Sequence, residues 1–95
     1  MDNNFKAYEE ASELLKALAH PVRLCIVKGL LEKGRCNVSH MQECLDIPQS
    51  TVSQHLQKLR NAGIVETERN GLEINYRIKN DVVIKLTRAI FGEEL

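Results

Sequence analysis

The hydrophobic residues of this chain change their spacing once along its length. Up to residue 61 they recur at steps of three and four, which predicts α-helices, and from residue 65 to residue 78 they alternate, which predicts β-strands. The helical part divides into four stretches, at residues 5–18, 21–32, 38–45 and 48–61. A further amphipathic stretch of about a dozen residues follows Asn80. The predicted order is therefore four helices, a β-hairpin and a last helix.

Residues with known preferences for helix ends mark the boundaries of these stretches. Pro21 follows His20 at the start of the second helix, where the missing N–H of proline is not needed. Asn37 is a suitable N-cap for the third helix, and Gly63 lies just past the end of the fourth, as a C-cap does. No segment has the composition of a linker, so we expect one domain over residues 1–95.

A two-residue turn is predicted at Asn70-Gly71, between the two alternating segments. Pairing Arg69 with Leu72 across this turn would place five side chains on one buried face: Val65, Thr67, Leu72, Ile74 and Tyr76. The same register would set Glu68 opposite Glu73, a mildly unfavourable pair of like charges. Either these glutamates turn into solvent or the loop is wider than two residues.

The charges are balanced in total but unevenly distributed. The chain has 13 Lys plus Arg against 13 Asp plus Glu, and acids cluster near both ends, at Glu9, Glu10, Glu13, Glu93 and Glu94. Residues 47–63 contain no carboxylate at all, and their polar positions are mainly Gln, Ser, Thr, His, Lys and Arg. The fourth helix is therefore suited to lie against a polyanion.

Two short helices joined by three or four residues, the second free of acid, are typical of a helix-turn-helix. In the major groove a carboxylate would be repelled by phosphates, whereas short amide and hydroxyl side chains can reach base edges. The first turns of the fourth helix supply candidates for reading bases: Gln49, Ser50, Thr51, Ser53 and Gln54. Candidates for contacts with the DNA backbone follow along the helix and at the hairpin tip: Gln57, Lys58, Arg60, Arg69 and Asn70. The hairpin would be the wing, although its glutamates (Glu66, Glu68 and Glu73) weaken its role as a DNA contact.

Three segments resemble the ArsR/SmtB family of bacterial winged-helix repressors: LLKALAHPVRLCIVKGL, VSHMQECLDIPQSTVSQHLQKLRNAGIV and NGLEINYRI. The resemblance implies a mainly α winged helix-turn-helix with a β-hairpin wing, in the order ααααββα. It also implies a homodimer that binds a palindromic operator in double-stranded DNA and represses transcription. Gln49, Ser50, Ser53 and Gln54 match the family's base-reading positions. Because family members pair through their first and last helices, the implied dimer interface is Phe5, Tyr8, Leu15, Val83, Leu86, Ile90 and Phe91.

The chain departs from the family at both of its common metal sites. One is a C-V-C run before the recognition helix, and the aligned stretch here has Asn37 and Ser39 where the two thiolates are expected. The other needs Asp and His along the last helix, which here has Asp81 but no histidine. PagR-like members, which PQSTVSQHL and GLEI-x-Y resemble, also lack these residues. We therefore expect no metal, no cofactor and repression that does not depend on a metal.

The odd number of cysteines and the absence of an export signal argue against a disulfide framework. Cys25 and Cys44 lie on apolar helix faces and are expected in the core. Cys36 follows Arg35 and precedes a helix, surroundings that lower the pKa of a thiol, so it is a candidate for redox or persulfide chemistry. Among the histidines, we expect His55 to be partly buried with a hydrogen bond, His20 to set the turn before Pro21, and His40 to face solvent.

Several classes of protein are excluded. The chain has no Gly-x-Ser-x-Gly, no glycine-rich phosphate loop and no zinc-enzyme motif, so we do not expect an enzyme. MDNNFKAYEE is acidic where an export signal is basic, and the apolar runs are far shorter than the roughly 20 residues that span a membrane. We expect a cytoplasmic protein with no membrane contact.

Three hypotheses remain. The first is a homodimeric repressor that reads a palindromic operator with its fourth helix. The second is a protein-interaction adaptor that binds no DNA and uses its apolar terminal helices, which the neutral total charge and the glutamates of the wing favour. The third is a repressor of the same family that responds to thiol oxidation or to a metal.

Overall fold

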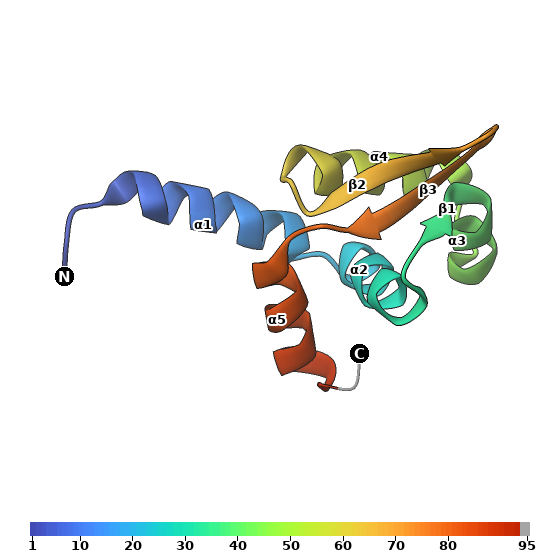
Figure 1. The fold of residues 1–95 in the computed structure, drawn as a ribbon. Coiled ribbons are helices and arrows are strands. Elements are labelled where there is room, and N and C mark those ends of the chain that lie inside the picture. Colours follow the sequence, from blue (N-terminus) through green and yellow to red (C-terminus); the bar gives the residue numbers. More distant parts are fainter. Residues whose placement is uncertain (94–95) are drawn as a thin grey trace.

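The computed structural model describes residues 1–93. Its helices are α1 (Phe5–Leu18), α2 (Pro21–Lys33), α3 (Val38–Leu45), α4 (Gln49–Asn61) and α5 (Asp81–Phe91). Its strands are β1 (Cys36–Asn37), β2 (Val65–Asn70) and β3 (Glu73–Ile78) (Figure 1). The predicted succession of four helices, hairpin and last helix is confirmed, as is the winged helix-turn-helix architecture.

Three side chains cap the first turns of helices, as their positions in the sequence suggested. His20 Nδ1 accepts a hydrogen bond from the backbone N–H of Val22 at 3.1 Å, at the start of α2. Asn37 Oδ1 accepts from the N–H of His40 at 2.8 Å, at the start of α3. Asn80 caps α5 in the same way. Each cap satisfies an N–H that the helix itself leaves without a partner.

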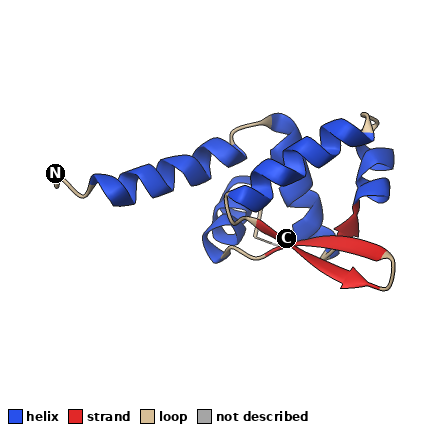
Figure 2. Cartoon of the chain, turned by 90° about the horizontal axis from the view of Figure 1, so that it is seen from above, coloured by secondary structure: helices blue, strands red, loops and turns tan. Residues whose placement is uncertain are grey.

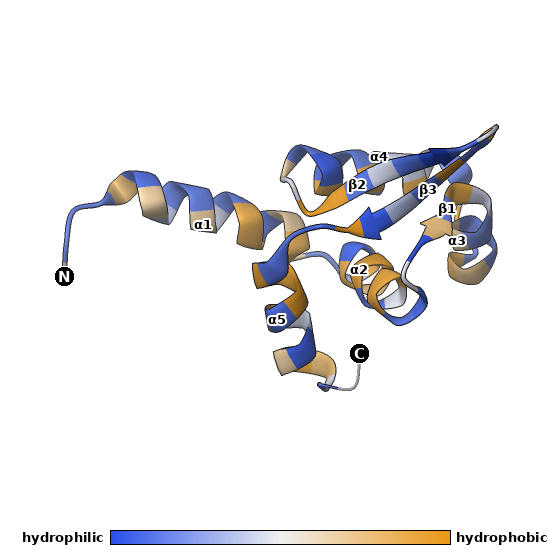
Figure 3. Cartoon of the chain, in the orientation of Figure 1, coloured by the Kyte–Doolittle hydropathy of each residue, from blue (hydrophilic) through white to orange (hydrophobic). Residues whose placement is uncertain are grey.

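The hydrophobic core forms where α2, α4 and the hairpin meet. Val27 and Leu30 of α2 are buried against the inner stripe of α4, which is Val52, Leu56 and Leu59 as predicted. In Figure 3 most of α4 and the outer part of the hairpin are hydrophilic, whereas α2 and α5 contain many hydrophobic residues. The core therefore holds α4 by one side only and leaves its opposite side exposed.

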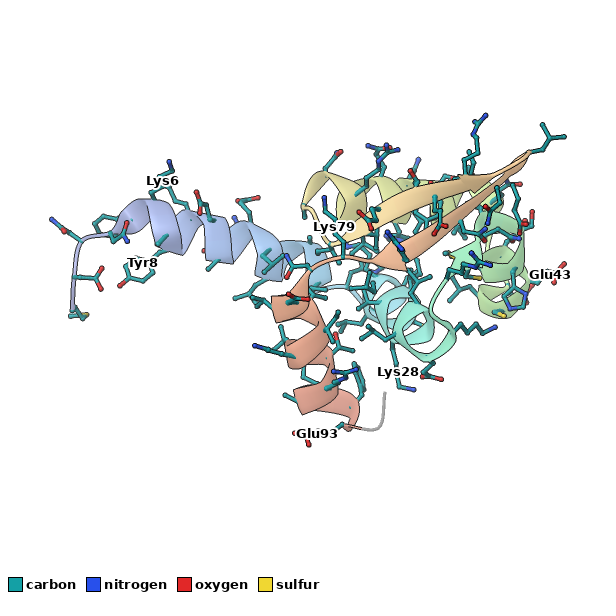
Figure 4. All side chains as sticks on the ribbon, in the orientation of Figure 1. Lys6, Tyr8, Lys28, Glu43, Lys79 and Glu93 are labelled. Atoms are coloured by element: carbon teal, nitrogen blue, oxygen red, sulfur yellow. The ribbon has the colours of Figure 1, made fainter. Side chains whose placement is uncertain are left out.

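Helix α1 projects from the rest of the molecule as an arm (Figures 1 and 2). Its C-terminal part is anchored through the buried side chain of Leu18 and through Leu14 and Ala17, which pack against the core. Lys6 and Tyr8 lie on the part of the arm that is far from the core (Figure 4). The first half of α1 thus has apolar side chains that its own chain does not cover.

The sheet has a third strand that the sequence pattern did not reveal. β1 pairs with β3, so the antiparallel strand order is β1-β3-β2, and Cys36 lies opposite Tyr76. A strand of two residues is too short to show an alternating pattern. It nevertheless ties the start of α3 to the hairpin.

The predicted hairpin register is wrong by two residues. Asn70 pairs with Glu73 and Arg69 with Ile74, so the loop is Gly71-Leu72. Gly71 has φ 64°, which fits the first position of a type II′ turn, whereas a type I′ turn at Asn70-Gly71 would need positive φ at both residues. The like-charge pair therefore does not form, since Glu68 faces Asn75.

The predicted burial of the hairpin's apolar face is correct only at its base. Val65 is buried and Tyr76 packs against the core, but Leu72 is 102% exposed and Ile74 is 40% exposed. Both exposed residues lie toward the tip, which extends beyond the helices (Figure 1). An alternating pattern identifies the face of a strand but does not show how far along the strand the core extends.

Candidate nucleic-acid interface

The turn between α3 and α4 is set by an aspartate in the left-handed region. Asp46 has φ 54° and is the only non-glycine residue with positive φ in residues 1–93. Aspartate adopts this conformation more readily than most residues. Its N–H closes α3 on Gln42 O at 2.8 Å, and two residues later Pro48 O accepts from the N–H of Thr51 at 3.0 Å to open α4. The chain thus reverses within three residues, as a helix-turn-helix requires.

The exposed side of α4 consists of a polar stripe with one cation on each flank. At about 100° per residue, the side opposite the buried residues is centred on Ser50, Gln54, Gln57 and Asn61, all of which are exposed. Lys58 and Arg60 are separated by about 160° around the helix axis and so lie on opposite flanks. A helix lying in a groove would direct these cations toward opposite walls.

The predicted base-reading residues are all on α4, but not all equally accessible. Gln49, Ser50, Ser53 and Gln54 are exposed, whereas Thr51 is half-buried at the edge of the helix. In both views the hairpin runs beside α4, with its tip at the same end of the molecule as the first turn of α4 (Figures 1 and 2). Arg69 and Asn70, near that tip, are exposed as well.

The cations of this surface are free of carboxylates. Within residues 1–93, none of Lys58, Arg60 and Arg69 forms an ion pair. On the exposed side of α4 the hydrogen bond from Gln57 Nε2 to Asn61 Oδ1, at 2.8 Å, holds two side chains of the polar stripe together. The surface therefore presents donors and positive charge.

The glutamates of the wing are occupied by partners of their own. Arg77 binds Glu66 at 2.7 Å and Glu68 at 3.7 Å, and Arg35 lies 3.9 Å from Glu68. Glu73 accepts a hydrogen bond from Asn37 Nδ2 at 2.6 Å. Since these carboxylates are countered locally, they weaken the wing as a DNA contact less than the sequence suggested.

A buried arginine, which the sequence analysis missed, connects α4 to the end of α1. Arg23 is only 8% exposed, and its Nε donates to Ala17 O at 2.6 Å. Its Nη1 lies 3.2 Å from Nδ1 of His55. The ring centroid of His55 is 4.5 Å from that of His20, and the two ring planes are tilted by 46°. The predicted partial burial and hydrogen bonding of His55 are therefore confirmed. In a sequence, an arginine among apolar residues of a buried helix is the signal that could have revealed this contact.

The surroundings of the histidine on α4 favour its neutral form. Burial lowers the pKa of His55, and the neighbouring charges of His20, Arg23 and Lys58 lower it further. When the Arg23 guanidinium donates to Nδ1, that nitrogen must act as an acceptor, which requires the neutral ring. The orientation of α4 is thus connected to a titratable group whose pKa lies below its ordinary value.

The expectations for the cysteines need correction. Cys25 and Cys44 are exposed and not in the core, because the apolar contacts of α2 and α3 are made by neighbouring positions such as Ile26 and Met41. The predicted low pKa of Cys36 is also wrong: burial raises the pKa of this thiol, and the Lys33 ammonium opposes the rise only in part. The guanidinium of Arg35 is directed toward Glu68.

The residues around Cys36 do not fit the metal site that some family members have. The side chain of Asn37 is committed to capping α3 and to Glu73, and Ser39 is exposed. Residues 1–93 contain no group of three His, Cys, Asp or Glu side chains placed to hold a metal ion. Nor does this part of the chain contain a helix long and apolar enough to cross a membrane.

Five of the seven side chains predicted for a dimer interface are exposed: Phe5, Tyr8, Leu15, Ile90 and Phe91. Val83 is not available, because it is 0% exposed in the core of its own chain, and Leu86 is half-buried against that core. Val82, one position earlier, is the exposed residue of this turn of α5. The error is one of helical phase, since neighbouring apolar residues differ by about 100° in direction.

The fold and the exposed side of α4 together define a winged helix-turn-helix protein. In agreement, the sequence profile of a family described as a helix-turn-helix domain matches residues 18–68. The chain is 44% identical over 89 residues to the transcriptional repressor PagR of Bacillus anthracis, covering 90% of this chain and 89% of that protein. The crystal structure of PagR superposes with a TM-score of 0.83 at 41% identity, covering 92% of this chain and 99% of the other.

Two further proteins place the chain more narrowly. It is 50% identical over 70 residues to the repressor SmtB of Mycobacterium tuberculosis strain H37Rv, which covers 74% of this chain and about half (51%) of SmtB. The homodimeric winged helix-turn-helix DNA-binding domain Mb0332 of Mycobacterium bovis is similar in structure, with a TM-score of 0.82 at 30% identity over 95% of this chain and 82% of the other. The chain belongs to the ArsR/SmtB family of winged helix-turn-helix transcriptional repressors. The two curated relatives are both named as transcriptional repressors.

Proposed function

We propose that this protein is a cytoplasmic homodimer that represses transcription by reading a palindromic operator with α4. The observation that carries the proposal is the exposed side of α4, which has no carboxylate and has on each flank a cation that forms no ion pair within residues 1–93. A solvated helix face has no need to exclude acids, whereas a helix between two rows of phosphates does.

The roles of the side chains follow from their places on the helix. The early polar residues would read base edges in the major groove: Gln49, Ser50, Thr51, Ser53 and Gln54. The later residues and the wing tip would bind the phosphate backbone: Gln57, Lys58, Arg60, Arg69 and Asn70. Thr51, being half-buried, would contribute through its methyl group at the edge of the groove.

The exposed apolar residues of α1 and α5 are the proposed dimer interface. Phe5 and Ile90 are 66% and 58% exposed, a costly arrangement for an isolated chain of this size. Mb0332, which shares the fold, is itself described as homodimeric. A two-fold dimer would present two copies of α4 to half-sites about one helical turn, or roughly 34 Å, apart.

Fluorescence anisotropy tests the proposal by comparing the affinity for two labelled duplexes of equal length. One comes from the protein's own upstream region and the other has the same bases in shuffled order. Lys58→Gln should weaken binding to both duplexes and reduce the salt slope by about one unit. Lys79→Gln is the matched control, because Lys79 is also an exposed lysine without an ion pair in residues 1–93 but lies at the base of the hairpin (Figure 4).

A second pair of measurements separates base reading from backbone binding. Gln54→Ala should reduce the preference for the operator by about 1–3 kcal/mol while changing affinity for the shuffled duplex little. No binding to either duplex at low salt would refute the repressor and favour an adaptor that pairs with another protein through α1 and α5. Equal affinity for both duplexes at moderate salt would refute operator reading.

A further inference from the structure

All three cysteines line one apolar pocket on the side of the molecule away from α4. The pocket lies between α2, β1 and α3 and has a volume of about 110 Å³. Its apolar walls include Ile26, Leu30, Met41 and Leu45, and Lys33 and His40 also line it. Gly29 contributes no side chain, and a Cβ built there meets nothing within 4 Å. The pocket is thus a preformed apolar space next to nucleophilic groups.

One of the three thiols is paired with a base. Cys44 is exposed, and its Sγ lies 3.6 Å from Nε2 of His40, one helical turn earlier on α3. The ammonium of Lys33 contacts the same nitrogen. An imidazole within reach of a thiol can take the proton of that thiol as it attacks.

The other two thiols lack this arrangement. Cys36 is half-buried, its Sγ donates to its neighbour's carbonyl at 3.4 Å, and burial raises its pKa. Cys25 is exposed and interacts with the charge of Lys28, but within residues 1–93 it has no hydrogen bond to an imidazole that could take its proton. Cys44 is therefore the thiol with a base within reach.

We propose that this pocket captures small apolar electrophiles of the α,β-unsaturated carbonyl class, with Cys44 as the nucleophile. In the reaction the thiol proton passes to His40, Sγ bonds to the β-carbon, and the electrons of the carbon–carbon π bond move to the α-carbon. The α-carbon then takes the proton back from His40, so nothing is oxidised or reduced. An engineered cavity of 150 Å³ holds benzene, so a pocket of this volume suits a reagent of about five or six heavy atoms.

Capture would alter the helix that precedes the recognition helix. The pocket separates α2 from α3, and α3 is joined to α4 by only three residues. A bound group would be held between α2 and α3 and bias the packing of α3, and through it the position of α4. This consequence rests on the proposed repressor function, whereas the capture itself does not.

Two reagents of similar size but different polarity, cyclopent-2-enone and acrylamide, test the proposal. Peptide mass spectrometry measures the rate of adduct formation at each cysteine, and each rate is divided by that of glutathione with the same reagent. We expect Cys44 to react first. Its normalised rate should be about tenfold higher with cyclopentenone than with acrylamide, because the apolar ring transfers about two methylene-sized groups from water into the pocket.

Three variants distinguish the parts of the site. Gly29→Leu fills the pocket, so it should reduce the rate of adduct formation with cyclopentenone about tenfold and leave the rate with acrylamide unchanged. Gly29→Ala, which serves if the leucine disturbs folding, should reduce the cyclopentenone rate by a smaller factor. His40→Ala should slow both reagents equally. The proposal would be overturned if Cys25 or Cys36 were modified first, or if the two reagents gave equal normalised rates. It would also be overturned if the cyclopentenone rate were unaltered in both Gly29 variants.

Operator binding by the modified protein is measured separately by anisotropy. Cyclopentenone should weaken operator binding by the wild-type protein but not by Cys44→Ser. Capture without any change in affinity would overturn the regulatory role. If the unmodified protein binds no DNA, the repressor function fails, and the adduct rates still decide whether the pocket captures electrophiles.

Discussion

Replacing Arg23 by methionine should destabilise the fold by about 3 kcal/mol. Arg23 donates to Ala17 O at 2.6 Å, to Lys16 O at 3.4 Å and to His55 Nδ1 at 3.2 Å. A hydrogen bond from a charged donor contributes about 1.5–3 kcal/mol when its acceptor is otherwise left buried and unpaired, and the longest of these three contributes least. Methionine keeps the packing of the aliphatic stem, so the loss should reflect the hydrogen bonds.

This estimate translates into a large change in melting temperature. For a domain of this size, each kcal/mol shifts Tm by about 4–8 °C, so a fall of roughly 12–24 °C is expected. Circular dichroism at a fixed protein concentration measures it, because the Tm of a dimer depends on concentration. Arg23→Lys should give an intermediate value, since lysine keeps the charge but lacks the planar fork that reaches both helices.

The matched control is Arg35→Met, which removes an exposed guanidinium whose ion pair with Glu68, at 3.9 Å, is long. Exposed pairs of this kind contribute about 0.5 kcal/mol or less, so its Tm should stay close to that of the wild type. If Arg23→Met melted no lower than Arg35→Met, the conclusion that Arg23 holds α4 against the end of α1 would be refuted.

Three further changes have defined outcomes. Because burial lowers the pKa of His55, this side chain takes up a proton at a higher pH in the unfolded chain than in the folded one. The contribution of His55 to the free energy of unfolding should therefore be fully present above about pH 6.5 and be lost as the pH falls through the lowered folded-state pKa. Urea titrations from pH 5 to 7 measure this dependence, and His55→Asn should flatten it. Gly29→Ala should raise the free energy of unfolding by about 0.8–1 kcal/mol, because the new Cβ meets no neighbour within 4 Å and alanine favours the helix. An unchanged or lower urea midpoint would contradict this prediction. Ile90→Glu should halve the molecular mass measured by light scattering at micromolar concentration, because Ile90 is an exposed apolar residue of α5. Lys85→Gln changes the charge of α5 by the same amount and should leave the mass unchanged. If the Ile90→Glu variant were still a dimer, this face of α5 would be excluded from the interface.

The helices were predictable because several kinds of evidence coincide at their ends. At Asn37 a capping side chain, the start of an apolar repeat and the preceding glycine all indicate the same boundary, and the structure places the helix start there. The acid-free side of α4 was predictable for a similar reason, since helical spacing fixes which residues point away from Leu56.

The errors arise where the outcome depends on the neighbours of an element. The strand at Cys36 exists only because β3 pairs with it, and no local pattern marks it. The register of the hairpin depends on which residue adopts positive φ, and Asn70 and Gly71 both tolerate it, so the sequence permitted two turns. The exposure of Cys44 and the burial of Val83 depend on where neighbouring helices lie across each face, which a single helix does not encode.

The recognition helix is positive although the formal charges of the whole chain sum to zero. Lys58 and Arg60 lie on α4, which has no carboxylate, whereas α1 has Glu9, Glu10 and Glu13 against Lys6 and Lys16. Such a protein is not drawn to DNA from a distance; it is only oriented once it comes within a Debye length, about 8 Å at physiological salt. In the proposed repressor, random genomic DNA would therefore retain little of the protein, and occupancy of the operator would depend on contacts made inside the groove.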